Sequence, residues 1–185
     1  MTTTWQRSTL LFATLTALCA LGGCGKAPIE DAVGKNDRKA VAEAIKAGAD
    51  VNARTSSGDT PLLLAAKSAQ SSSAQGLIEG GADVQVRDEA GNSVLHYAAR
   101  SGMTGICALL IERGVAVDVT GEGGATPLHF AVGSGQQETA KFLVRHGASL
   151  EKKNSAGAST LDLVTASGDQ RFLNDLNLAA ATRKP

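Results

Sequence analysis

The chain has 185 residues, of which 43% are hydrophobic and 3% aromatic, and its 18 basic residues balance its 18 acidic residues. This length predicts one domain, and the lack of a basic excess in the sequence argues against a nucleic-acid partner. So few aromatic residues beside 21 glycines do not suit a conventional core. They suit a stack of repeats, in which small side chains let helices approach.

Residues 1–23 differ from the rest of the chain and predict a secretory signal peptide. Arg7 is their single charge, and it precedes an apolar run over residues 10–21 that is too short to span a bilayer comfortably. The run ends in Leu-Gly-Gly-Cys at residues 21–24, which resembles the lipobox of bacterial lipoproteins. The resemblance implies that Cys24 is acylated. The alternative is ordinary cleavage after either glycine, which leaves a soluble periplasmic protein.

The residue after the anchor is Gly25 and not the aspartate that retains enterobacterial lipoproteins in the inner membrane. The resemblance therefore implies a bacterial envelope lipoprotein that faces the periplasm, with the outer membrane favoured over the inner. Only residues 25–27 separate Cys24 from the first expected helix. At about 3.5 Å per extended residue, this tether spans roughly 10 Å, so we expect the first unit to lie near the lipid headgroups.

Glycines recur with a period of 33 residues through the rest of the chain, which predicts a solenoid of repeated units. The two series are Gly25, Gly58, Gly91, Gly124 and Gly157, and Gly48, Gly81, Gly114 and Gly147.

The most regular unit opens with Thr-Pro-Leu-His at residues 126–129, and degenerate copies stand at residues 60–63, 93–96 and 159–162. With this period, the pattern resembles the ankyrin-repeat family from about residue 25 to residue 176. The resemblance implies a mainly α solenoid of stacked helix-turn-helix units with short β-hairpin fingers. It also implies a non-enzymatic scaffold that binds a protein and needs no cofactor.

The expected organisation follows the period. It comprises a signal peptide (1–23), a lipidated cysteine with a short tether (24–27), an N-terminal capping repeat (28–57), three ankyrin repeats (58–90, 91–123 and 124–156) and a C-terminal capping repeat with a tail (157–185).

Local signals support helix pairs within these units. Thr60 is expected to cap a helix that begins at Pro61, where the missing N–H costs nothing. Ala69 stands where later units have glycine, so a left-handed turn there costs about 1 kcal/mol. Residues 81–88 alternate apolar and polar residues and end in turn formers, which predicts a β-hairpin finger.

Several residues that resemble catalytic or metal-binding groups have a structural explanation. His96 and His129 lie 33 residues apart, and the resemblance implies that each bonds backbone and a neighbouring hydroxyl rather than a metal. Cys107 occupies a slot that is small and apolar in other units, so we expect it to be buried and inert. Ser149 and Lys152 match an acyl-enzyme spacing, but they do not lie in an expected helix.

Two classes of function remain open, a binding module in the cell envelope and an enzyme with a dispersed site. The first is favoured, because no acid, base and nucleophile align in register. A structural spacer is a third possibility. Some envelope ankyrin proteins act as immunity factors against a toxin or assist an enzyme such as a catalase, which gives an alternative role at family level only.

The resemblance places the binding surface on the finger tips and first helices of a monomer. Tyr97 and Phe130 are the available aromatic anchors, with core packing as the alternative for both, and Arg100 is the expected charged hot spot. The expected protein-binding residues are Ser56, Ser57, Asp59, Lys67, Glu89, Asn92, Tyr97, Arg100, Ser101, Glu122, Ala125, Phe130, Ser134 and Ser155.

Overall fold

The computed structural model describes residues 28–55 and 57–182, which form ten α-helices and no β-strand. The helices follow one another in five antiparallel pairs, together with a short 3-10 turn, η1 (Glu122–Gly124). They are α1 (Pro28–Gly34), α2 (Arg38–Lys46), α3 (Pro61–Lys67), α4 (Ser71–Glu79), α5 (Val94–Arg100), α6 (Thr104–Glu112), α7 (Pro127–Gly133), α8 (Gln137–Arg145), α9 (Thr160–Ser167) and α10 (Gln170–Ala181). The predicted helical repeat solenoid is confirmed.

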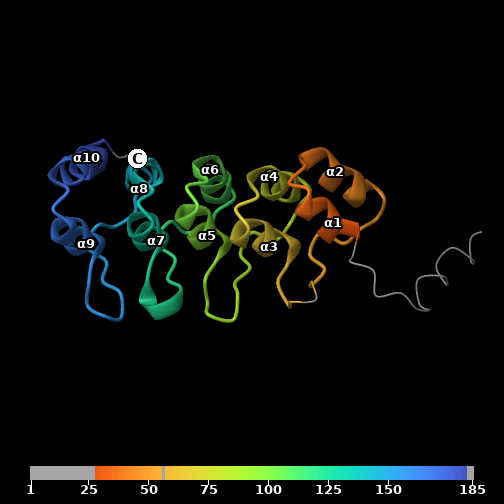
Figure 1. Ribbon diagram of the computed structural model, residues 1–185, viewed down its shortest axis with the longest axis horizontal. Coiled ribbons are helices and arrows are strands. Elements are labelled where there is room, and N and C mark those ends of the chain that lie inside the picture. Colours follow the sequence, from red (N-terminus) through yellow and green to blue (C-terminus); the bar gives the residue numbers. More distant parts are fainter. Residues whose placement is uncertain (1–27, 56, 183–185) are drawn as a thin grey trace, which may run out of the picture.

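The helix pairs stand side by side in a single row (Figure 1). The first helices α3, α5, α7 and α9 form the lower layer in this view, and the second helices α4, α6, α8 and α10 form the upper layer. The loops that join successive pairs extend below the first helices as fingers. The surface formed by these fingers and the adjoining sides of the first helices is called the finger face below.

Capping residues fix where the first helices begin. The Thr60 hydroxyl accepts a hydrogen bond from Leu63 N at 3.3 Å, and the Ser159 hydroxyl accepts one from Asp162 N at 3.1 Å. Proline follows the cap at the start of α3 and α7. These residues satisfy or remove N–H groups that have no partner within the helix, so each first helix starts at the same point of its repeat.

The core runs continuously through the array because small side chains lie between larger ones. Ala65, Ala98 and Ala131 are fully buried on the first helices, where they let neighbouring pairs approach. Leu110 and Leu143 are fully buried on the second helices. Burying such a side chain stabilises the fold by about 1.5–3 kcal/mol. No pair could bury this surface alone, so the units depend on their neighbours.

The fingers are tight hairpin-like loops with little β pairing. Each closes on itself through two backbone bonds, as in Asp88 N to Asn92 O at 3.0 Å and Gly91 N to Asp88 O at 3.0 Å. Among the described residues, the only β-type pairing consists of the isolated bridges Arg87–Ser93 and Lys153–Ser159. Antiparallel pairing in these fingers is therefore limited to single bridges among the described residues, and it does not extend into a ladder.

The turn between α3 and α4 forces Ala69 into the left-handed region, with φ of 56°. Later units place Gly102, Gly135 and Gly168 at this position, with φ of 70–74°. Replacing Ala69 by Gly removes the clash of its Cβ with the backbone, and the added freedom of the unfolded chain offsets part of that gain.

We therefore expect Ala69→Gly to raise the free energy of unfolding by about 0.5–1 kcal/mol, as measured by urea denaturation. Ser68→Gly is the matched control, because Ser68 has an ordinary φ of −90° and glycine there can only loosen the chain. If Ala69→Gly lowers the free energy of unfolding as much as Ser68→Gly does, the backbone of Ala69 is not strained.

Candidate functional site

The finger face carries most of the residues expected to bind a partner, at different depths. The exposed ones are Ser57, Glu89, Arg100, Glu122, Ser134 and Ser155, and the half-buried ones are Asp59, Lys67, Ser101, Ala125 and Phe130. Asn92 and Tyr97 are buried, at 3% and 8% exposure. Ser56 lies outside the described residues.

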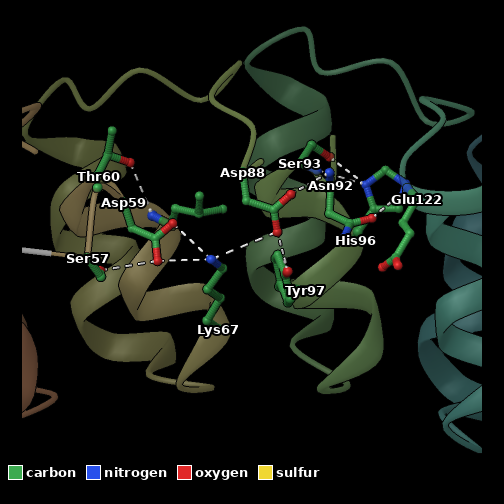
Figure 2. A network of polar contacts seen from close by, with 12 residues as sticks. Ser57, Asp59, Thr60, Lys67, Asp88, Asn92, Ser93, His96, Tyr97 and Glu122 are labelled. Carbon is green, nitrogen blue, oxygen red and sulfur yellow. Dashed lines mark hydrogen bonds and ion pairs between the residues drawn. The ribbon is translucent and has the colours of Figure 1, made fainter. Parts of the chain in front are cut away.

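A polar network joins the second and third units beneath this surface (Figure 2). Lys67 Nζ lies 2.8 Å from Asp59 Oδ1 and 3.9 Å from Asp88 Oδ2. The Tyr97 hydroxyl donates a short hydrogen bond to the same Asp88 oxygen, and Asn92 N donates to the other carboxylate oxygen at 2.8 Å. One lysine from α3 is therefore shared between the carboxylates of two successive fingers.

The network keeps its charges over the ordinary pH range. Burial disfavours the charged form of Asp88, but hydrogen bonds from Tyr97 and Asn92 and the charge of Lys67 hold the pKa of that carboxyl below its usual value. Burial also opposes the charge on Lys67, yet its hydrogen bond and ion pair with Asp59 raise the pKa of the amine. The pKa of Tyr97 is raised by burial and by its bond to Asp88, so the phenol stays a donor.

The structure corrects the expectation for Asn92, which was predicted to face a partner. Its side-chain oxygen accepts a hydrogen bond from Glu122 N at 2.9 Å, so it ties its own finger to the next one. A side chain with 3% exposure that is already bonded in this way cannot be a direct anchor. Its contribution is to fix the spacing of two fingers.

The two aromatic candidates are not equivalent. The Tyr97 ring is covered by cations, with Arg100 Cζ 5.0 Å and Lys67 Nζ 5.6 Å from its centroid. Tyr97 therefore supports the finger face from below and positions the Arg100 guanidinium by a cation–π contact. Phe130 is half-buried, and its ring packs edge-on against the His96 ring, with the ring centroids 5.1 Å apart and an interplanar angle of 72°.

The structural role predicted for the histidines is confirmed. His96 Nδ1 accepts from Ser93 N at 3.0 Å, and its Nε2 donates to Ala125 O in the next unit at 3.2 Å. His129 repeats this pattern with Thr126 N and Ala158 O, at 3.2 Å for both. Burial lowers the pKa of His96 to about 4, so the imidazole is neutral at physiological pH.

Cys107 is fully buried, as predicted, and burial raises the pKa of its thiol to about 12. A nucleophile needs the thiolate, so this side chain is inert at neutral pH. Within residues 28–55 and 57–182, no group of three or more His, Cys, Asp or Glu side chains is placed to hold a metal ion. Over the same ranges, no helix is long and apolar enough to cross a bilayer.

Arg87 braces two fingers, a role that the sequence prediction missed. Its guanidinium donates to Gly91 O at 3.0 Å and to Thr120 O at 2.7 Å, so it links the finger before α5 to the finger before α7. Arg54, one period earlier, donates to Gly58 O of its own finger in the same way. Arginine recurs after 33 residues, at Arg54 and Arg87, and this recurrence could have indicated the bracing role. The sequence prediction instead relied on the glycines and the tetrapeptides that open each unit.

The finger face is thus a rigid array of charged tips on cross-braced loops, with no aligned set of catalytic groups among the residues described above. The family profile for ankyrin repeats (3 copies) matches residues 68–154. No curated protein matches the chain. Ankyrin repeats form protein–protein interaction modules and are typically non-enzymatic. The regular helix pairs, the histidine ties and this match together show that the chain contains ankyrin repeats.

Proposed function

We propose that this protein captures a protein partner on the finger face of its second to fourth units while a lipid on Cys24 holds it in the bacterial cell envelope. The observation that carries the binding proposal is the braced network beneath that surface. Because Lys67, Asp88 and Asn92 already fix the fingers, a partner does not have to order them on binding. Preorganisation of this kind increases affinity without adding contacts.

Exposed charges above the network are the expected contacts. Glu89 and Glu122 lie on successive fingers, and among the described residues their side chains have no hydrogen-bond or ion-pair partner in the fold. Arg100 is exposed but held over the Tyr97 ring, so less side-chain entropy is lost when it binds. A positioned arginine flanked by two free carboxylates fits a partner surface of mixed charge.

The partner can be identified by capture from detergent-solubilised envelopes of the source cells, followed by mass spectrometry. Against the purified partner, we expect Glu89→Lys and Arg100→Glu each to weaken binding at least about tenfold, or about 1.4 kcal/mol, by titration calorimetry. Both change exposed charges, so the fold should be retained in circular dichroism.

The matched controls are Glu112→Lys and Arg145→Glu, which reverse exposed charges on the second helices α6 and α8. These should leave affinity unchanged. Equal losses from the finger face and from the second helices would refute the proposed surface.

The envelope location is proposed from the sequence around Cys24. The apolar leader and the small residues before this cysteine support acylation, and Gly25 supports delivery to the outer membrane. Residues 25–27 then place the first repeat close to the bilayer, within roughly 10 Å of the anchor.

We expect Cys24→Ala to abolish acylation, so that the protein stays unprocessed or moves to the soluble fraction. Intact mass and partition between membrane and soluble fractions provide the measurement. Cys19→Ala is the matched control, because Cys19 lies inside the leader and should be lost with it. If the Cys24→Ala protein keeps the added mass of the lipid and stays in the membrane fraction as the unchanged protein does, Cys24 is not the anchor.

A further inference from the structure

The second unit differs from the next two units at two positions, one in its second helix and one directly after it. Gly76 lies on α4 and Gly80 follows the end of α4, whereas the equivalent positions one period later carry Leu109 and Arg113, and in the following unit Phe142 and His146. A Cβ on Gly76 would lie 3.2 Å from the Arg38 carbonyl oxygen, so α4 packs closely on α2 there. A Cβ on Gly80 would collide with Ile45 Cδ1, so the two glycines let α4 and α2 approach, and Ile45 lies over Gly80.

A furrow of about 930 Å³ lies between these two helices, which is within the size range of ligand clefts. Its floor is apolar, because exposed Ala42 and half-buried Ile45 lie beside the two glycines. Polar and charged side chains surround that floor. The lining residues are Asn36, Asp37, Arg38, Lys39, Ala42, Ile45, Lys46, Ser72, Gly76, Glu79 and Gly80.

The furrow lining carries three basic residues (Arg38, Lys39 and Lys46) against two acidic ones (Asp37 and Glu79), a formal charge of +1. Glu79 is paired with Arg38 at 2.7 Å, and the Asp37 carboxylate accepts a hydrogen bond from Lys39 N at 2.8 Å to cap α2. The amines of Lys39 and Lys46 have no hydrogen-bond or ion-pair partner among the described residues. They are seven residues apart, two helical turns, and so lie on one side of α2.

The furrow also belongs to the end of the array that the chain enters from Cys24. Because α1 and α2 are antiparallel and joined by a short turn, the start of α1 lies at the same end of the pair as Ile45 and Lys46. Cys24 precedes Pro28 by only four positions. An apolar floor between free lysines, close to an anchor point, matches the chemistry of an amphiphile with an anionic head.

We propose that the furrow seats an anionic phospholipid of the bilayer and forms a second membrane contact beside the lipid on Cys24. The inference rests on the proposed anchoring. In this arrangement Lys39 and Lys46 contact the phosphate, and the upper acyl chain lies along Ala42 and Ile45. The first unit is then held flat on the membrane, and the fingers of later units keep a fixed height above it.

Photo-crosslinking tests this directly on the full-length processed protein in phosphatidylcholine vesicles. The probe is phosphatidylglycerol with a diazirine in its upper acyl chain, added as a minor component, and the neutral comparison is phosphatidylcholine with the same diazirine. We expect crosslinks to concentrate on peptides of α2 and α4, with roughly tenfold more from the anionic probe. Peptides of α8 and α10, which lie farther along the row from the furrow (Figure 1), should carry little label from either lipid.

Two variants separate the furrow from general attraction to the vesicle. Lys39→Glu combined with Lys46→Glu, and separately Ala42→Glu, should each remove the anionic preference, since all three positions are exposed and the changes should not disturb folding. Arg145→Glu combined with Arg171→Glu reverses two exposed charges elsewhere and should preserve it. Circular dichroism checks that every variant is folded.

The result that overturns the proposal is equal labelling by the two probes, or labelling spread evenly over all second helices. Labelling of the furrow that disappears only when a protein partner is added would instead show that the partner covers it. Intact mass reports acylation of Cys24 independently. If the protein is not acylated but still shows anionic-selective labelling, the lipid anchor is refuted and the furrow is supported. If the protein is acylated but shows no selective labelling, the anchor is supported and the furrow is refuted.

Discussion

Replacing Leu110 by alanine should lower the free energy of unfolding by about 2–5 kcal/mol. Leu110 lies on α6 and is fully buried, and α6 packs against α4, α5 and α8. Removing three carbons leaves a cavity in the middle of the row, and the neighbouring helices cannot all close on it at once. Urea denaturation followed by circular dichroism measures the loss.

The neighbouring residue provides a matched control, because Leu109 is on the same helix but only half-buried. Leu109→Ala should cost clearly less than Leu110→Ala. Similar costs for the two substitutions, or a cost below about 0.5 kcal/mol for Leu110→Ala, would contradict this register of α6.

Acid should destabilise the protein through His96. Its pKa is about 4 in the folded protein and about 6.5 in an unfolded chain, so between these values the unfolded state binds more protons. The contribution of neutral His96 is fully present above pH 6.5 and is lost as the pH falls toward 4. At about 1.4 kcal/mol per pH unit, this one side chain accounts for about 3 kcal/mol.

The physical cause is burial first, because the imidazole is fully buried between two units, and the nearby Arg87 guanidinium adds repulsion. Protonation would also place a hydrogen on Nδ1, which accepts from Ser93 N and faces the Ser93 hydroxyl. Denaturation curves at several pH values between 4 and 7 measure the slope.

His96→Leu is the matched variant, because Leu63 occupies the equivalent place one repeat earlier. It should reduce stability at neutral pH and flatten the pH dependence. An unchanged slope in His96→Leu would assign the acid sensitivity to other groups.

Much of the fold follows from the sequence because its signals are local and repeated. Capping by Thr60, the strained turn at Ala69 and the burial of Cys107 each depend on a residue and its place in the 33-residue period. The extent of β pairing in the fingers could not be predicted, for a physical reason. Ala82, Val84 and Val86 alternate with polar residues because they pack against the helical core, not because they face a second strand.

The site was less predictable, because its geometry depends on side chains from different units. The period alone could indicate that Lys67 and Glu89 lie near the finger face, but not that Lys67 reaches Asp88. Likewise, Asn92 has the position of a surface residue, and its burial results from the contact with Glu122 N. Depth and pairing are properties of the assembled stack.

The histidine ties also give the array a direction. His96 and His129 each donate to a carbonyl of the following unit, at Ala125 and Ala158. The last unit has Asp162 in this place, and its hydrogen bonds from Ser159 keep the pKa of the carboxyl low. An ionised carboxylate has no hydrogen to donate onward. A further repeat placed after α10 would therefore lack this connecting bond, as the junction between the second and third units does, where Leu63 stands in place of histidine.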